Sequence, residues 1–263
     1  MSGESDAWEH AIAASINNSV PGLKAERPKV SVKFPDVRVD YKNFQGDRAI
    51  WVEVKMNHTD NLMNPRFTFI DGKWGTTEAY ASPAVDVLCE YWNDNAAAQA
   101  WLEDLRKFLT ANKWKGDVRN MSLYSTKTER AIDKNSVSFE LMKKYLASIV
   151  QKGRTKNICK EDNVDVGKLV STHYLKGKGA IAYYVSSKDD FYQFKLPGSK
   201  SNPLMIPDVP VFKGHNTIVL RVGDRSGNFE IQAEVKLKAL PHSDYSVAPK
   251  TKKVNPFTMI RVK

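Results

Sequence analysis

Asp36, Glu53 and Lys55 are the residues of this chain whose types and spacing could do chemistry. Glu53 and Lys55 stand two apart in an apolar run, so they share one face if that run is a strand. Two carboxylates can hold Mg²⁺, which polarises a phosphoryl oxygen and lowers the pKa of a bound water. A neighbouring lysine can orient that water or stabilise the pentavalent phosphate. These residues therefore form the minimum set for metal-assisted hydrolysis of a phosphodiester.

A β-hairpin is the element that would bring the three side chains together. Two runs of alternating apolar residues are joined by the turn 43–47, and this pattern predicts two antiparallel strands. If the hairpin closes about Gln45–Gly46, Asp36 lies opposite Lys55 and diagonal to Glu53. The sequence thus predicts that two carboxylates and one ammonium converge on one face of the hairpin.

Asp40 is the alternative acidic ligand. It shares a strand face with Asp36, and it lies 13 positions before Glu53, whereas Asp36 lies 17 positions before it. Either carboxylate could hold the metal. The preceding Pro35 and the cross-strand geometry favour Asp36.

The pairing of Pro35–Asp36 with Glu53–Val54–Lys55 resembles the PD-(D/E)XK nuclease superfamily, over residues 6–75. The resemblance implies an α/β, restriction-endonuclease-like core, a mixed central sheet flanked by helices. It also implies a Mg²⁺ ion, for which Mn²⁺ is an expected substitute, held by Asp36, Glu53 and the backbone carbonyl of Val54. Lys55 would then position the water.

The activity that the resemblance implies is that of an endodeoxyribonuclease of restriction or phage type, and a junction or repair nuclease is a close relative. RNA stays open as a substrate because the motif contacts phosphate and not sugar. The competing class is a nucleic-acid-binding protein that keeps the fold without catalysis. A cutter of double strands often acts as a homodimer, and the sequence leaves the oligomeric state open.

Residues 6–16 are predicted to form a helix, because their apolar residues recur at helical spacing. The resemblance implies that such a helix precedes the hairpin and often supplies another acidic residue, which here would be Glu9. A solvated helix carboxylate is the equal alternative for Glu9.

The triplet Glu234–Val235–Lys236 repeats the E-V-K pattern near the end of the chain. It falls in a second predicted hairpin, with strands over 217–222 and 229–237. Glu234, Lys236 and Lys238 are expected to form the solvated face of an antiparallel sheet. The first triplet is therefore preferred as the active site.

Positive charge is unevenly distributed along the chain. The formal net charge is +10, and residues 1–135 hold 18 Lys and Arg against 19 Asp and Glu, whereas residues 136–263 hold 22 against 11. This suggests a nuclease core over 1–130 and a basic, β-rich nucleic-acid-binding part over 131–263, either separate or integrated into the same domain. Lys152, Arg154, Lys156 and Lys160 are expected in a basic loop that contacts phosphates or is a plain connector.

The remaining segments are predicted from periodicity and capping. Ser82–Pro83 begins a helical region to residue 111 with a break at 93–95, and residues 136–151 form a further helix. Trp92, Trp101 and Trp114 are expected in the core. Strands are expected over 180–186 and 191–196, and the strand 181–185 could be the fourth strand of the nuclease sheet.

Two distant cysteines make a disulfide framework improbable, so a reducing, cytoplasmic compartment is expected. The sequence shows no apolar run long enough for a signal peptide or a membrane span, and no membrane partner is expected. DNA is the expected partner.

Overall fold

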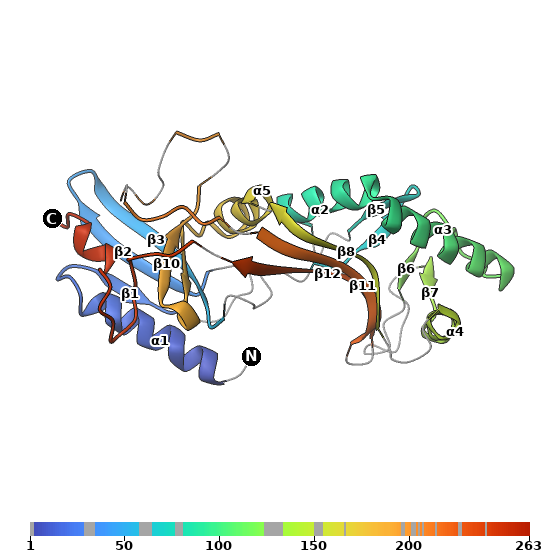
Figure 1. Cartoon of the computed structure of the whole chain (residues 1–263), viewed down its shortest axis with the longest axis horizontal. Helices are drawn as coiled ribbons and strands as arrows, with labels where there is room; N and C mark the ends of the chain where they lie inside the picture. Colours follow the sequence, from blue (N-terminus) through green and yellow to red (C-terminus); the bar gives the residue numbers. More distant parts are fainter. Residues whose placement is uncertain are drawn as a thin grey trace. The chain divides into compact units, whose positions relative to one another are not determined.

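A computed structural model of the chain describes residues 3–28, 35–57, 65–76, 81–123, 134–149, 155–165, 167–195, 198–200, 204, 206, 208–213, 215–225, 228–239 and 241–263. The fold is mixed α/β (Figure 1). The chain divides into two compact units: unit 1 comprises 1–60, 165–216 and 236–263, and unit 2 comprises 61–164 and 217–235. The boundary does not fall at residue 130, because 165–216 and 236–263 group with residues 1–60, which agrees with the alternative of an integrated downstream part.

Unit 1 contains the hairpin and its flanking elements. They are α1 (Gly3–Asn17), β1 (Lys24–Glu26), β2 (Val37–Asn43), β3 (Gly46–Lys55), α5 (Gly167–Ser171), the π-helix η2 (Thr172–Lys178), β9 (Ala182–Val185), the 3₁₀ turn η3 (Ser186–Lys188), β10 (Asp190–Gln193) and the 3₁₀ turn η4 (Pro256–Met259).

Unit 2 contains most of the remaining helices and strands. They are β4 (Thr68–Ile70), β5 (Lys73–Gly75), α2 (Pro83–Asp94), α3 (Ala96–Ala111), β6 (Ser122–Leu123), β7 (Ser136–Val137) and α4 (Phe139–Ile149), together with the greater part of β8 (Thr155–Asp165), β11 (His215–Arg225) and β12 (Asn228–Ala239).

The sheet of unit 1 has the order β1-β2-β3-β9-β10. All neighbours are antiparallel except β3 and β9, which pair in parallel, with Glu53 beside Tyr183. A parallel pair needs a crossover, and the chain passes through unit 2 and then α5 and η2 before it returns. The prediction that the strand over 181–185 is the fourth strand of this sheet is confirmed.

The hairpin register differs from the prediction by two positions. Val37 pairs with Val52, and Asn43 pairs with Gly46, so the loop is Phe44–Gln45. The Asn43 side chain accepts a hydrogen bond from the N–H of Gln45, and Gly46 adopts a φ of +112°. Both features favour a turn that closes one residue earlier than the predicted one. Continuing this register puts Asp36 opposite Glu53, not opposite Lys55. Because side chains alternate between the two faces of a strand, a register difference of two residues leaves every side chain on its predicted face.

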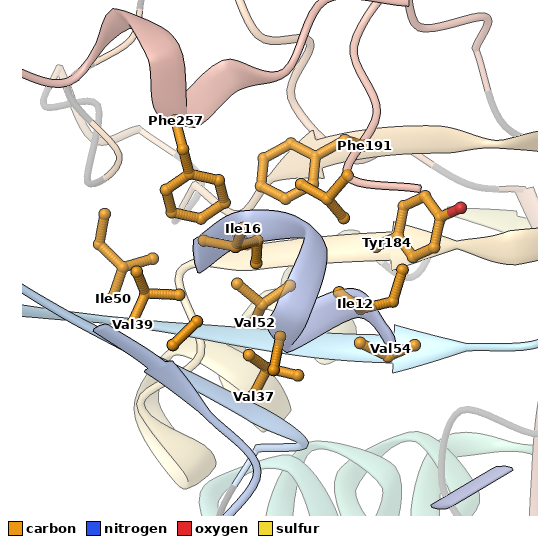
Figure 2. Close-up of a cluster of buried hydrophobic side chains, with 14 of the residues drawn as sticks. Ile12, Ile16, Val37, Val39, Ile50, Val52, Val54, Tyr184, Phe191 and Phe257 are labelled. Atoms are coloured by element: carbon orange, nitrogen blue, oxygen red, sulfur yellow. The ribbon is translucent and has the colours of Figure 1, made fainter. Parts of the chain in front are cut away.

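One face of this sheet packs on α1 and on residues 241–263, here called the C-terminal segment (Figure 2). Ile12 and Ile16 of α1 are fully buried against Val37 and Val52 of the hairpin, and Phe257 of η4 joins the same core. Valines at alternate positions of β2 and β3 therefore face this layer, which fixes the direction of the acidic residues between them.

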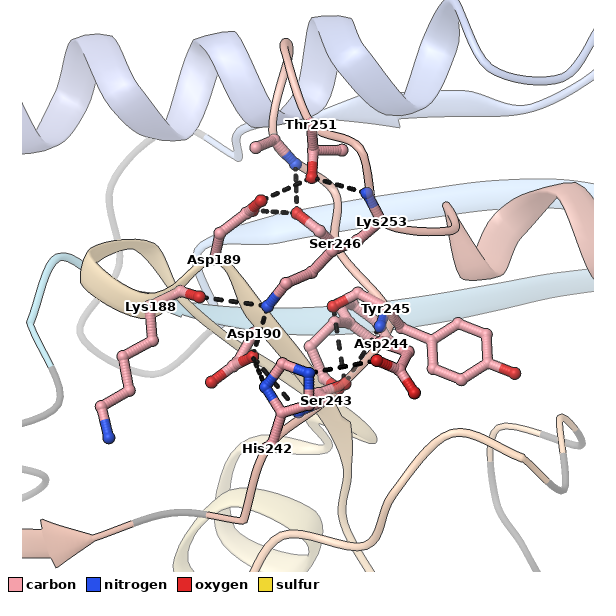
Figure 3. Close-up of polar contacts among 12 residues, drawn as sticks. Lys188, Asp189, Asp190, His242, Ser243, Asp244, Tyr245, Ser246, Thr251 and Lys253 are labelled. Carbon is pink, nitrogen blue, oxygen red and sulfur yellow. Dashed lines mark hydrogen bonds and ion pairs between the residues drawn. The ribbon is translucent and has the colours of Figure 1, made fainter.

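The C-terminal segment is held to β10 by polar contacts (Figure 3). The Asp190 carboxylate is 2% exposed and accepts the Lys253 ammonium at 2.6 Å and the Tyr192 hydroxyl at 3.0 Å. Asp189 has a φ of +54° and accepts the hydroxyls of Ser246 and Thr251. Segments some 60 residues apart in sequence are joined in this way.

In unit 2 the capping predictions are confirmed: Ser82 accepts the N–H of Val85 at the start of α2, and Asn95 separates α2 from α3. Trp92 and Trp101 are buried, as expected. Trp114 is partly exposed, so its assignment to the core is wrong. It follows the end of α3, where the amphipathic stripe that buries Trp101 no longer applies.

Two further predictions in this region are wrong. Residues 155–165 form β8, the edge strand of a three-stranded sheet ordered β12-β11-β8, and not a loop. The helix predicted over 136–151 is shorter, because Ser136 and Val137 pair with β6 before α4 begins. In both cases a pairing partner distant in sequence overrides the local pattern.

Candidate active site

The structure brings Asp36, Glu53 and Lys55 together at the open end of the β2–β3 hairpin. The Lys55 ammonium lies 2.7 Å from Glu53 Oε1. The Glu53 side chain is 1% exposed, whereas that of Lys55 is 20% exposed. The carboxylate therefore lies beneath the lysine, and solvent reaches the pair from the lysine side.

Asp36 completes the cluster from the bend that precedes β2. Its Oδ2 accepts the backbone N–H of Val54 at 2.8 Å, which fixes the carboxylate next to Glu53. Burial and the charge of Glu53 raise the pKa of Asp36 to about 6, although Lys55 and the N–H of Val54 oppose this effect. Burial alone would lower the pKa of Lys55, but the charges of Glu53 and Asp36 outweigh burial and raise it. Lys55 is therefore a charged ammonium at neutral pH.

Glu9 of α1 lies close enough for its charge to add to the raised pKa of Asp36. It is buried, and it forms an ion pair with Arg27 and accepts the Ser5 hydroxyl at 3.2 Å. Arg27 also contacts Asp6 at 2.7 Å. Glu9 is thus not a solvated helix carboxylate: it belongs to an ion-pair network behind Asp36.

Arg27 was not predicted from the sequence. It lies just beyond β1, and only the pairing of β1 with β2 brings it next to α1 and Asp36. Tyr183 and Tyr174 were also missed. Tyr183 lies beside Glu53 in the β3–β9 register, and its ring is 5.8 Å from that of Tyr174, which is fully buried. Burial and then the charges of Glu53 and Asp36 raise the pKa of Tyr174, so its hydroxyl lies near both carboxylates. No signal in the local sequence indicates these two neighbours.

Asp40 does not join the cluster. It pairs with Ala49 in the hairpin and forms an ion pair with Arg38 at 2.9 Å on a partly exposed surface. It stands four residues along β2 from Asp36, which is about 13 Å at the usual rise of a strand. The register therefore separates the two candidate ligands.

The second E-V-K triplet has a different environment. Glu234 is 8% exposed and lies 2.5 Å from the Arg221 guanidinium on the neighbouring strand β11. The expected solvated face is therefore wrong for Glu234. The charge of Glu234 is neutralised by this ion pair. The side chains of Lys236 and Lys238 are outside the part of the chain that the structure describes.

The basic residues assigned to phosphate contacts are only partly described. Lys152 and Arg154 lie outside the described residues. Lys156 lies on β8, where its ammonium donates to the Ile149 carbonyl at 3.4 Å, and Lys160 is exposed and pairs with Asp162 at 3.1 Å. Neither described lysine lies on a loop, so the basic loop as predicted does not exist over 155–160.

The donor set at the hairpin suits a hard divalent cation. Asp36 and Glu53 offer oxygen atoms only, and a Mg²⁺ site needs no more than one or two carboxylates beside water and a substrate phosphate. Over the described ranges, no three His, Cys, Asp or Glu side chains come together as a metal-binding group. Burial is the main cause of the raised pKa of Asp36, and the charge of Glu53 adds to it. A cation bound between the two carboxylates would offset this second contribution.

No family model, no curated protein and no solved structure matches this chain. In the part of the chain that the structure describes, no helix has the length and apolar character needed to cross a membrane.

Proposed function

We propose that this protein is a Mg²⁺-dependent endodeoxyribonuclease that hydrolyses phosphodiester bonds at Asp36, Glu53 and Lys55. The observation that carries the proposal is the convergence of these three side chains at one end of the hairpin. A raised pKa at a partly solvent-accessible carboxyl, next to a second buried carboxylate, is typical of functional sites.

The surrounding elements support the same proposal. A helix with a buried acidic residue precedes the hairpin, and a strand parallel to β3 follows after α5 and η2. This order agrees with what the resemblance to the PD-(D/E)XK superfamily implies. The E-V-K strand β3 is the central strand of the five-stranded sheet.

Each residue has a role that follows from its position. Asp36 and Glu53 would hold Mg²⁺ with the Val54 carbonyl, and the ion would supply a polarised phosphoryl oxygen and a water of lowered pKa. Lys55, which stays protonated, would orient the attacking water or stabilise charge on the phosphate. Glu9 and Arg27 lie behind Asp36, and their ion pair joins α1 to the segment that follows β1.

The test is incubation of purified protein with supercoiled plasmid and Mg²⁺. Wild-type protein should give nicked or linear DNA, Mn²⁺ should replace Mg²⁺, and EDTA should stop the reaction. Lys55→Ala and Asp36→Asn should each lower the rate at least about a hundredfold. Asp40→Asn is the matched control, since it removes a carboxylate from the same strand outside the cluster, and it should keep wild-type rates.

Cleavage that survives Lys55→Ala, or that is lost in Asp40→Asn, would contradict this assignment of residues. Intact plasmid that is nevertheless retarded on a gel, in Mg²⁺ and in EDTA alike, would favour a nucleic-acid-binding protein without catalysis. Oligonucleotides of RNA would then be the next substrate to test.

A further inference from the structure

A second surface, in unit 2, has the properties of a nucleic-acid contact. A hollow of about 1020 Å³ lies between the end of α3 and the start of α4, lined by Lys113, Trp114, Lys115, Lys134 and Lys144 among others. We propose that this hollow binds an unpaired segment of DNA, with a base stacked on Trp114 and the lysines contacting the flanking phosphates. The choice of DNA rests on the proposed function.

The charge of the hollow favours a polyanion. All four lysines are exposed. Over the described ranges, none of the four has a carboxylate within ion-pair distance, and Lys144 donates only to the neutral Asn112 side chain, at 2.6 Å. Asp117, one of the two acids that line the hollow, already accepts from Asn120 and from the N–H of Arg119. Ammonium groups without acidic partners can replace counterions along a phosphate backbone.

The local backbone fixes Trp114 within this basic surface. Lys113 follows Asn112, the C-cap of α3, with a φ of +55°, and Trp114 then donates its N–H to the Leu109 carbonyl at 3.0 Å. The lysine side chains before and after the indole thus come from a turn of defined shape. An aromatic ring between lysines is the usual composition of surfaces that bind single strands, because every base offers a face for stacking.

The indole ring of Trp114 packs closely against the backbone of Gly116. A Cβ at this position would lie 2.2 Å from Trp114 Cζ2 and 2.5 Å from Cη2. The φ of Gly116 lies outside the left-handed region, so its backbone does not require glycine. The space is needed by the ring, which is held against the turn while remaining partly exposed.

The alternative is that these lysines stabilise the C-terminal end of α3 and bind no ligand. Cations near a helix C-terminus interact favourably with its dipole, by about 0.3–1 kcal/mol each. This role predicts a loss of stability on charge reversal and no effect on DNA. The two roles can therefore be separated by measuring melting temperature and DNA affinity on the same variants.

The test is fluorescence anisotropy of labelled oligo(dT) in EDTA, with the full chain, so that binding is measured whether or not the protein cleaves. Lys113→Glu/Lys115→Glu and Trp114→Ala should each weaken binding about tenfold, and Trp114→Phe should restore most of it. Gly116→Ala, which displaces the ring and leaves all charges, should weaken binding in the same direction. Lys24→Glu/Lys42→Glu in unit 1 changes the net charge equally and should weaken binding less than about threefold.

Three results would overturn the proposal. The first is wild-type affinity in the Trp114 and lysine variants. The second is a lowered melting temperature with unchanged affinity, which would assign the lysines to the helix end. The third is tighter binding of polyglutamate than of oligo(dT), which would indicate an acidic protein partner. Because none of these measurements depends on cleavage, failure of the proposed nuclease activity would remain distinct from failure of this inference.

Discussion

Asp36 is the residue whose ionisation most directly links stability and activity. Its carboxyl is held by the N–H of Val54, but it lies in a buried setting beside Glu53, and its pKa is raised from 3.8 to about 6. The folded protein therefore binds this proton more tightly than the unfolded chain does. The site keeps an ionised carboxylate at neutral pH at a cost in stability, which is the usual condition of a residue placed for function.

Asp36→Asn is predicted to stabilise the protein at pH 8 by about 1–2 kcal/mol, while abolishing cleavage. The sign follows from the raised pKa: the stability of the wild type falls as pH rises from about 4 through 6, because its proton leaves the unfolded chain first. The asparagine has no proton to lose, so its advantage should vanish as pH falls towards 4. Urea denaturation of both proteins across this pH range measures the difference. A gap between the two proteins that is the same at pH 4 and pH 8 would contradict the prediction.

At the scale of elements, polar contacts join the start of β10 to the C-terminal segment 241–263. Asp190 is buried, and Lys253, Tyr192 and the N–H of Ser243 all donate to it. A buried carboxylate with several donors is stabilising only as a complete set, since loss of the acid leaves donors without a partner. The same C-terminal segment carries Phe257 into the core.

Asp190→Ala is therefore predicted to lower the free energy of unfolding by about 3 kcal/mol and to make residues 241–263 sensitive to protease. Asp244→Ala is the matched control, because that side chain is 87% exposed and, among the described residues, its carboxylate pairs with His242 alone. The control should change stability by less than about 0.5 kcal/mol. Equal effects of the two substitutions, by urea denaturation and limited proteolysis, would show that the segment is held by apolar packing alone.

The fold redistributes the charge of the whole molecule. Unit 1 carries 22 Lys and Arg against 14 Asp and Glu, and unit 2 carries 18 against 16. The excess positive charge that lies downstream in the sequence thus falls mostly in the unit that holds Asp36 and Glu53. The expected separation into a cutting half and a gripping half does not describe the folded chain.

Binding of duplex DNA is accordingly predicted to weaken steeply with salt, with a contribution from the exposed lysines near the C-terminal end of unit 1. Lys250→Glu/Lys252→Glu, which alters two exposed lysines of unit 1, should reduce the slope of log affinity against log salt by about 1–2. Anisotropy titrations in EDTA at several salt concentrations measure this slope. An unchanged slope would exclude these lysines from the phosphate contacts.

The sequence by itself determined the local features of the fold and of the candidate site. Alternating valines predicted the hairpin and the face shared by Asp36, Glu53 and Lys55, and capping residues predicted the start of α2 and the break before α3. These features follow from period and from bonds between neighbours in the chain, so a short window contains all the information they need.

Only the tertiary structure decided what depends on pairing between distant segments. The return of β9 to lie parallel to β3, the separation of Asp40 from Asp36 and Glu53, and the place of Arg27 beside Glu9 all depend on register and sheet order. The two E-V-K triplets show the reason most clearly. They are identical in sequence, but Glu234 is neutralised by Arg221 on a neighbouring strand, whereas Glu53 lies beside a second carboxylate. Burial and charge neighbours are properties of the folded chain, and they give the same three residues different chemistry.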